Sequence, residues 1–187
     1  MAQVLINRGL TDAQNASVFL RPKLTQLIDP AEMPGIEPAI HRLKQAITNK
    51  EKITVYGDYD VDGITGVAIL WQVLTLLGAD VDYYIPHRID EGYGLNPEAI
   101  RTLAKSGTKL LVTVDCGVTA YISAELAGQL GLDLIITDHH QIGAQTICGL
   151  PKAVAIVHPA LKKSYPNQDS AGAMVAFKLA WAIANEF

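Results

Sequence analysis

The chain has 187 residues, a formal net charge of −4, and 49% hydrophobic against 18% charged residues. This length suits one domain of roughly 100 to 200 residues, and the composition excludes a disordered chain, which has few apolar residues and a high net charge. The acidic balance also excludes a generally basic surface. A nucleic-acid partner would therefore be held by a local patch or through metal ions.

The cysteines and the N-terminus indicate the compartment. Cys116 and Cys148 lie beside apolar residues, which argues against a disulfide framework and for a reducing compartment. We expect Cys116 to be a buried small residue rather than a nucleophile. The start MAQVLINRG lacks the basic and apolar regions of a signal peptide, and the uncharged run 63–79 is shorter than the roughly 20 apolar residues of a membrane span. The sequence predicts a cytoplasmic protein with no membrane contact.

The first fifty residues are predicted to form a helical segment. Thr11 and Gln14 have the spacing of a capping box, which would begin a helix toward Leu20. An irregular connector with three prolines follows, and the apolar residues after it recur at helical spacing. Helices are therefore expected at 2–8, from Thr11 toward Leu20, and at 37–49.

From residue 51 onward, short apolar runs alternate with helical stretches. Strands are expected at 53–56, 81–85, 109–114, 133–137 and 153–157, and helices at 64–77, 97–106, 119–130 and from about 170 to the end. Because the strands are continuously apolar, the pattern predicts an α/β fold with a mainly parallel five-stranded sheet and helices on both faces. The helix at 64–77 is apolar nearly all round, so we expect it to be buried under the N-terminal helices.

Polar residues interrupt this pattern at the ends of four strands. They are Asp58, Asp60 and Asp62 after the first strand, Asp115 after the third, Asp138, His139 and His140 after the fourth, and His158 after the fifth. The carboxyl ends of parallel strands form one rim, where open α/β sheets bind ligands. A single aspartate after a strand is usually a cap or turn residue, but four interruptions on one rim predict a common site. For His158, which precedes Pro159, a structural role is favoured.

The stretch DYDVDG at 58–63 has the start of a calcium-binding EF-hand loop. That loop needs an acidic residue at its twelfth position, which here is Ile69, and a helix rather than a strand before it. A Gly-Lys-Ser/Thr phosphate-binding motif is also missing. Carboxylates with imidazole suit Mn²⁺ or Mg²⁺, and several carboxylates can hold two cations ~3.5 to 4 Å apart. The sequence therefore predicts metal-dependent hydrolysis of a phosphate ester or anhydride.

Several motifs also carry a family resemblance. GDYDVDG, VTVDCG and TDHH resemble the first three motifs of the DHH phosphoesterase superfamily. Within it, VYGDYDVDGITG, PHRIDEGYGLN and AGAMVAFKLAWA resemble the N-terminal catalytic lobe of RecJ-type exonucleases, over nearly the whole chain. The resemblance implies a two-metal enzyme of DNA repair or recombination that cuts single-stranded DNA from the 5′ end with Mn²⁺ or Mg²⁺.

The resemblance also implies roles for single residues. The implied metal ligands are Asp58, Asp60, Asp62, Asp115 as the bridging carboxylate, and His139; the implied catalytic set is Asp60, Asp62, Asp115, His139 and His140. His140 would face the scissile phosphate, and Asp138 would orient the histidines as a partner behind the ligands. Arg88 is a candidate phosphate contact, although an ion pair with Asp90 or Glu91 is an equally open alternative.

The chain departs from the family pattern after His140. The family's fourth-motif aspartate has no counterpart, because the only acidic residues there are Asp169 and Glu186. We expect a helical segment at 1–50 and, at 51–187, a DHH-type domain that stops before the fourth motif and a second lobe. Two alternatives stay open: a DHH phosphodiesterase acting on short oligoribonucleotides or cyclic dinucleotides, and a non-catalytic metal-binding or interaction module.

Overall fold

The computed structural model describes residues 2–142 and 149–187, and its five strands form one parallel sheet in the order β2-β1-β3-β4-β5. The strands are β1 (Ile53–Gly57), β2 (Val81–Tyr84), β3 (Leu110–Val114), β4 (Asp133–Thr137) and β5 (Ala155–Val157). The helices are α1 (Ala2–Asn7), α2 (Ala13–Leu20), α3 (Ile36–Thr48), α4 (Val61–Leu76), α5 (Pro97–Lys105), α6 (Tyr121–Gln129) and α7 (Gly172–Ala184), with 3₁₀ turns at Leu24–Gln26, Pro30–Glu32 and Pro159–Leu161. The predicted α/β fold is confirmed.

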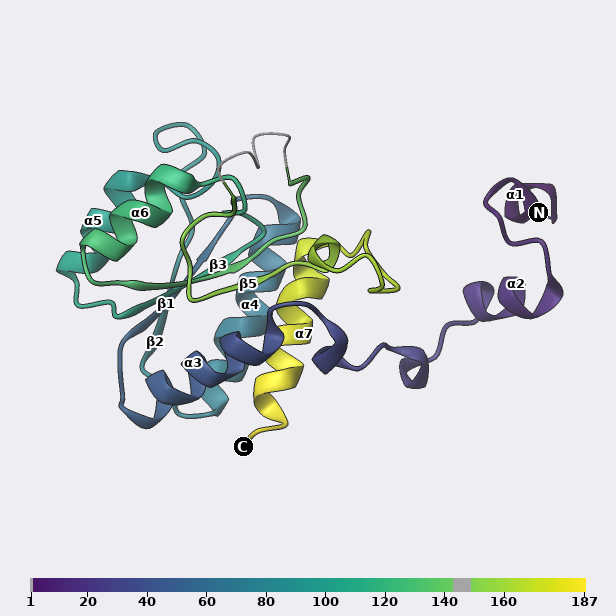
Figure 1. The fold of residues 1–187 in the computed structure, drawn as a ribbon, viewed down its shortest axis with the longest axis horizontal. Coiled ribbons are helices and arrows are strands. Elements are labelled where there is room, and N and C mark those ends of the chain that lie inside the picture. The colour runs from purple at the N-terminus through teal and green to yellow at the C-terminus, as the bar shows by residue number, and fades with distance from the viewer. Residues whose placement is uncertain (1, 143–148) are drawn as a thin grey trace.

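Helices cover both faces of the sheet. Figure 1 shows α5 and α6 together on one side and α3, α4 and α7 on the other. Each side has its own buried apolar cluster, because the side chains of a strand point alternately to the two faces. The central strands β1 and β3 are buried along their whole length, as their continuously apolar sequences predict.

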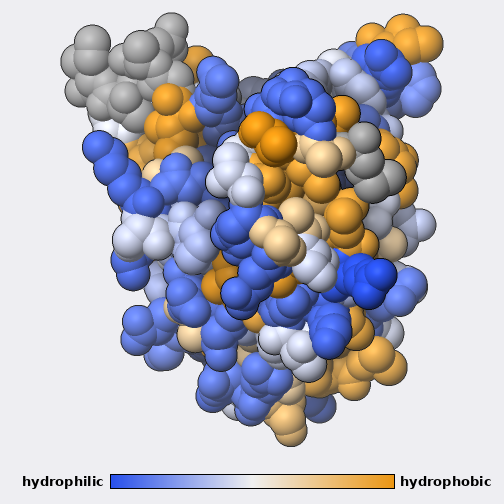
Figure 2. All heavy atoms as spheres, turned by 90° about the vertical axis from the view of Figure 1, so that its right-hand side faces the viewer, coloured by the Kyte–Doolittle hydropathy of each residue, from blue (hydrophilic) through white to orange (hydrophobic). Residues whose placement is uncertain are grey.

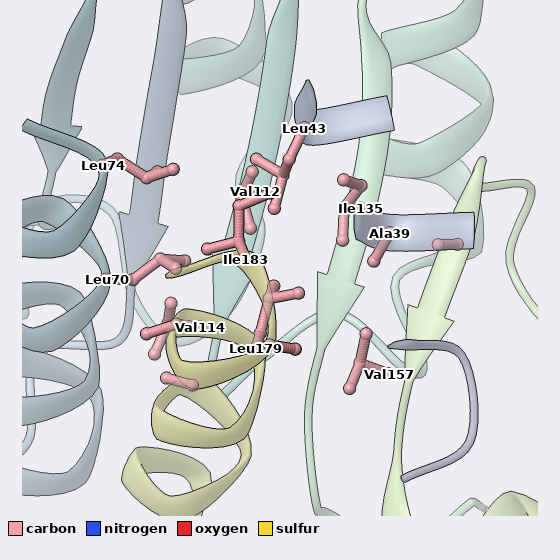
Figure 3. Close-up of a cluster of buried hydrophobic side chains, with 14 of the residues drawn as sticks. Ala39, Leu43, Leu70, Leu74, Val112, Val114, Ile135, Val157, Leu179 and Ile183 are labelled. Carbon is pink, nitrogen blue, oxygen red and sulfur yellow. The ribbon is translucent and has the colours of Figure 1, made fainter. Parts of the chain in front are cut away.

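The larger core lies between the sheet and the helices α3, α4 and α7. In Figure 3, Leu43, Leu70, Val112 and Leu179 come together from three helices and one strand, and all four are fully buried. Full burial of such a side chain stabilises the fold by about 1.5 to 3 kcal/mol. This core fixes the ends of β1 and β3 relative to α7, an arrangement on which the site described below depends.

Helix α4 is covered by α7 rather than by the N-terminal helices, so that expectation was wrong. Its buried side chains, such as Leu70 and Leu74, belong to the core that α7 completes, whereas α1 and α2 bury no residue at all. Its outer face stays open, with Val61 and Leu76 more than four-fifths exposed. The all-round apolar pattern therefore overstated how much of α4 is covered, and it did not identify which helix covers it.

The helix starts follow from capping side chains. Asn96 caps α5 ahead of Pro97, as predicted, and accepts the backbone N–H of Glu98 at 2.7 Å. Asp12, not the predicted Thr11, caps α2 by accepting the N–H of Asn15 at 2.8 Å. Because aspartate and threonine are both good N-caps, adjacent candidates are hard to separate by sequence.

Residues 2–27 form an N-terminal arm, with α1 and α2 lying apart from the α/β body in Figure 1. In Figure 2, where this side faces the viewer, orange apolar side chains lie among blue hydrophilic ones. The exposed apolar residues of the arm include Val4, Ile6, Val18, Phe19, Leu20 and Leu24. The arm joins the body where the ammonium of buried Lys178, on α7, donates to the carbonyl of Ile28. Burial lowers the pKa of Lys178.

Cys116 is buried, as predicted, and burial raises the pKa of its thiol well above the usual value. Cys148 lies outside the described residues. Within residues 2–142 and 149–187, none of the helices has both the length and the apolar character needed to cross a membrane.

Candidate metal centre

The strand register places the predicted rim residues side by side. The last residues of β1, β3, β4 and β5 pair with one another across the sheet. The next residues along the chain are Asp58, Asp115, Asp138 and His158, which therefore follow one another along the carboxyl edge. The predicted gathering of these side chains on one rim is confirmed.

The aspartates after β1 have distinct environments. Asp58 is 1% exposed, and within the described chain its Oδ1 has no hydrogen-bond partner; burial is the main cause that raises its pKa. Asp60 caps α4, since its Oδ1 accepts the N–H groups of Asp62 at 2.9 Å and Gly63 at 3.0 Å. Gly63 is required here, because a Cβ would lie 2.5 Å from the Asp58 carbonyl oxygen.

Asp62 turns toward helix α7. Its Oδ2 accepts the backbone N–H of Gly172 at 2.7 Å, and its Oδ1 accepts that of Ala173 at 2.6 Å. The same Oδ2 lies 3.6 Å from Nε2 of His139. Asp62 thus lies beside the imidazole of His139, in the triplet Asp138-His139-His140 (the DHH triplet), and it also caps the distant helix α7.

Asp115 occupies the centre of the rim in a strained conformation. Its φ of 63° lies in the left-handed region, which non-glycine residues adopt uncommonly. The residue is 1% exposed, and its Oδ1 lies 3.1 Å from Nε2 of His139. Burial, followed by repulsion from Asp62, raises the pKa of Asp115 to about 7. The folded chain therefore holds this carboxyl where its ionised form is costly unless a cation lies beside it.

Asp138 organises the loop that carries the two histidines. Its Oδ1 accepts the N–H groups of His139 at 2.7 Å and His140 at 3.1 Å, and it lies 2.8 Å from Nδ1 of His140. Its Oδ2 accepts the N–H of Val118 at 2.8 Å. Burial opposes protonation of His140, but the bond to Asp138 and the nearby carboxylates outweigh it and raise the pKa of His140. Both Asp138 oxygens are occupied by protein donors, and its role of orienting the histidines stays a prediction.

His158 supports the same loop from β5. It is 1% exposed, its Nδ1 accepts the N–H of Ala160 at 3.1 Å, and its Nε2 lies 2.9 Å from the carbonyl oxygen of His140. Because Nδ1 accepts, Nε2 must carry the proton and donate it to that carbonyl. Burial lowers the pKa of His158, which keeps the ring neutral. His158 thus has the structural role favoured from the sequence, because its hydrogen bond holds the backbone of His140.

Arg88 lies at the rim without the alternative ion pair considered for it. Asp90 pairs with His87 at 2.7 Å, and the carboxylate of Glu91 accepts from the hydroxyl of Tyr84 at 2.5 Å. The guanidinium of Arg88 instead lies 5.2 Å from the ring centroid of Tyr59. Its charge also acts to lower the pKa of Asp58. An exposed cation is therefore free to meet an anion that approaches the rim.

A cavity of about 840 Å³ opens beside the DHH triplet. His140 and Asp138 form one wall, and Tyr93 and Tyr121 are among the other lining residues. The hydroxyl of Tyr93 lies 3.1 Å from Nε2 of His140. The cavity is wide enough for a small polar ligand whose phosphate would reach the histidine.

The side chains of the rim fit divalent cations. The rim holds two groups of three potential ligands, and within each group the ligand atoms lie within 4.8 Å of one another. Asp58, Asp60 and Asp115 form one group, and Asp115, His139 and His140 form the other. Both groups contain Asp115, and buried oxygens of Asp58 and Asp115 have no hydrogen-bond partner within the described chain. A buried carboxylate oxygen without a donor is costly, so a cation is the partner that would relieve the cost. Asp62 belongs to neither group.

The comparisons with known proteins identify the family. The model of the DHH family, N-terminal domain, matches residues 52–187. The chain belongs to the DHH family. It is 46% identical over 187 residues to the single-stranded-DNA-specific exonuclease RecJ of Bacillus subtilis, covering 100% of this chain and 23% of that protein. The Escherichia coli RecJ is 34% identical over 98% of this chain and 31% of its own length. This DHH chain thus spans less than a third of these curated relatives.

Solved structures agree with this DHH assignment. A crystal structure of exonuclease RecJ bound to manganese has a TM-score of 0.77 and 38% identity, over 86% of this chain and 40% of that one. RecJ of Thermus thermophilus in complex with Mn²⁺ has a TM-score of 0.76 and 33% identity, over 97% of this chain and 24% of that one. The predicted similarity to the N-terminal lobe of RecJ-type proteins is confirmed.

Sequence reasoning missed two contacts that shape this DHH site. It did not foresee that Asp62 binds the start of α7, or that His158 holds the carbonyl of His140. The small residues at the start of AGAMVAFKLAWA were a possible signal for the first contact, because glycine often marks a close approach. The second contact had no signal in the sequence, since it depends on the pairing of β4 with β5.

Proposed function

We propose that this DHH domain is the metal-dependent catalytic lobe of an exonuclease that hydrolyses single-stranded DNA from the 5′ end. The observation that carries the proposal is the membership of Asp115 in both groups of potential ligands, as a carboxylate that bridges two cations requires. The relatives named single-stranded-DNA-specific exonucleases support the choice of substrate.

We assign Asp58, Asp60, Asp115 and His139 from the two groups as ligands of two Mn²⁺ or Mg²⁺ ions. We add Asp62, which lies outside both groups but has Oδ2 3.6 Å from Nε2 of His139, and we reserve His140, the remaining group member, for the phosphate. The donors are carboxylate oxygens and an imidazole nitrogen, which suit these metals. Such ions, when bound, activate water and stabilise an in-line displacement at phosphorus. Relatives solved with Mn²⁺ and with Mg²⁺ support the choice of ions.

The remaining residues bind and orient the phosphate. Because Nδ1 of His140 is bonded to Asp138, its Nε2 is the nitrogen that would face the scissile phosphate. The raised pKa of His140 favours the protonated ring, which can donate to an anionic oxygen. Arg88 supplies a second positive charge at the same rim, next to Tyr59. Together the imidazolium of His140 and the guanidinium of Arg88 would hold the phosphate over the carboxylates.

The relatives extend well beyond the part that this chain covers, and we propose that efficient cleavage requires those further parts. A lone lobe offers one wall to a DNA strand, whereas closing a site excludes water and positions the substrate. An enzyme that acts on DNA works in the compartment that holds DNA, which supports a cytoplasmic location.

The test compares three substrates: 5′-labelled single-stranded DNA, a linear dinucleotide and a cyclic dinucleotide. Each is incubated with Mn²⁺ and either this chain or a longer protein that contains it, with Asp115→Ala as the inactive control. We expect Mn²⁺-dependent removal of 5′ nucleotides from DNA, strongest for the longer protein. A preference for either dinucleotide would contradict the exonuclease assignment. Cleavage of none of the three would indicate a non-catalytic module.

A further inference from the structure

The first turn of α7 lies directly against two carboxylates of the metal centre. The N–H groups of Gly172 and Ala173 donate to the two oxygens of Asp62, at 2.7 and 2.6 Å. First-turn amides have no acceptor inside their own helix, and the N-cap residue of α7, Ala171, offers no side-chain acceptor. Asp62, on α4 and 110 residues away, therefore caps α7 with both of its oxygens.

Gly172 also sets the space available to Asp115. A Cβ at position 172 would lie 2.3 Å from Oδ1 of Asp115 and 2.6 Å from its Cγ. Since real Cβ atoms do not approach other atoms this closely, only glycine leaves room for this carboxylate. Gly172 begins a regular helix, so space rather than backbone conformation requires the glycine. The Oδ1 atom involved is buried and has no hydrogen-bond partner within the described chain.

The position of α7 is itself fixed by close packing. Gly66 on α4 faces α7, and a Cβ there would lie 2.6 Å from Cγ1 of Val114 and 3.2 Å from Cβ of Ala176. Leu179 and Ile183, farther along α7, are fully buried in the core shown in Figure 3. The start of α7 therefore cannot move away from Asp62 and Asp115 without loss of this packing.

We propose that Gly172 and the first turn of α7 are positioning elements of the metal centre. Two amides orient Asp62, and the missing side chain of Gly172 admits Asp115, so both carboxylates are held in place before a cation arrives. The positive end of the α7 dipole also offsets part of their negative charge. This inference rests on the proposed metal centre, and it assigns a role to the AGAMV segment that is separate from ligation.

Three glycine-to-alanine variants test the proposal by calorimetric titration with Mn²⁺. Gly172→Ala should weaken Mn²⁺ binding at least tenfold. Gly128→Ala, in α6, is the matched control, because the added Cβ meets nothing within 4 Å, and it should bind Mn²⁺ as the wild type does. Gly66→Ala is an intermediate case: the added Cβ would lie 2.6 Å from Cγ1 of Val114, the residue before Asp115, and 3.2 Å from Cβ of Ala176 on α7, but it meets no carboxylate directly. It should lower the melting temperature and weaken Mn²⁺ binding less than Gly172→Ala does.

The outcomes separate the inference from the metal centre itself. Failure of the wild type to bind Mn²⁺ would overturn both. Wild-type binding with equal affinity in Gly172→Ala would overturn the positioning role alone. So would a loss of affinity in Gly66→Ala as large as that in Gly172→Ala, because the cause would then be the general packing around α7 and not the space that Gly172 leaves for Asp115.

A second measurement does not depend on the folding of a glycine variant. In the metal-free wild type, the amide protons of Gly172 and Ala173 should resonate downfield and exchange slowly, because both are bonded to a carboxylate. Asp62→Asn should move both resonances upfield, whereas the amide of Gly128 should stay unchanged. Amide resonances at 172 and 173 that do not respond to Asp62→Asn would overturn the proposal.

Discussion

Both ends of the sheet contain buried charged groups, but the partners of these groups differ. At the end where the strands begin, Arg42 on α3 is 7% exposed and bonds to Glu51 at 2.5 Å and to Asp133 at 2.6 Å. At the carboxyl end, Asp58 and Asp115 are each 1% exposed and have buried oxygens without partners within the described chain. One end pairs its carboxylates with a buried guanidinium, whereas among the described residues the other has only the exposed Arg88 and the partly exposed histidines near its buried carboxylates.

This difference separates a structural ion pair from a functional site. A buried charge is tolerated when its partner is present in the fold, as at Arg42. The carboxyl end instead keeps anions together in a strained, desolvated arrangement, which raises the pKa of Asp115 to about 7. Groups with such shifts are concentrated at functional sites, so the buried carboxylate oxygens that have no hydrogen-bond partner within the described chain indicate where a cation belongs.

The largest expected effect comes from removing the shared carboxylate. Asp115→Ala should abolish tight binding of two Mn²⁺ ions and weaken the remaining binding by more than about 100-fold. Mutation of a residue that only orients a metal ligand already lowers metal affinity by about 10- to 100-fold. Titration calorimetry gives both stoichiometry and affinity. Asp133→Ala, at the opposite end, is the control and should still bind two ions. Unchanged stoichiometry in Asp115→Ala would show that the site is wrongly assigned.

The next effect is a pH dependence of the metal-free protein. The pKa of Asp115 is raised from 3.8 to about 7 in the folded state, so its stabilising contribution is complete below about pH 4 and is lost as the pH rises through 7. The loss is at most about 4 kcal/mol, because one pKa unit corresponds to about 1.4 kcal/mol. In the presence of EDTA, urea unfolding of Asp115→Asn should depend less on pH over this range than that of the wild type. Parallel pH profiles would contradict the assigned pKa.

A smaller effect is expected at the opposite end. Arg42→Met leaves Glu51 and Asp133 without their cation and should lower the free energy of unfolding by about 2 to 3 kcal/mol, since both carboxylates are partly solvated. Lys44→Met breaks an exposed pair with Glu186 and should cost less than about 1 kcal/mol. Urea unfolding measures both. Weakened Mn²⁺ binding in Arg42→Met would mean that the two ends of the sheet are coupled and that the Arg42 ion pairs are not purely structural.

The fold was largely predictable because its signals are local. Apolar runs marked four of the five strands, whereas the edge strand β2 contains the exposed Asp82, and Asn96 with Pro97 marked the start of α5. The rim followed from the strands alone, since polar residues after parallel strands must share one edge. What covers α4 could not be predicted, because its partner α7 lies about a hundred residues later and its sequence is equally apolar. Propensity sets elements, whereas tertiary packing decides their neighbours.

In the candidate site, too, local signals were predictable and tertiary contacts were not. Residue types and spacing made Asp58, Asp115 and the triplet 138–140 candidates for the site, because metal chemistry restricts which side chains can serve. The supporting contacts were invisible, since each joins segments far apart in the sequence: Asp62 with Gly172, and His158 with the carbonyl of His140. Strand order decides the second of these contacts, and no sequence pattern gave that order.

A modest effect on Mn²⁺ binding tests the contact between His158 and His140. His158→Ala removes the donor to the carbonyl of His140 and should weaken Mn²⁺ binding about tenfold, the lower end of the range for residues that orient ligands. His158→Gln keeps an N–H group near the position of Nε2 and should restore most of the affinity, which a purely space-filling role would not require. The measurement is calorimetry on both variants, corrected for the folded fraction. Equal affinities of the Ala and Gln variants would show that His158 fills space in the core and does not hold the loop of the metal centre.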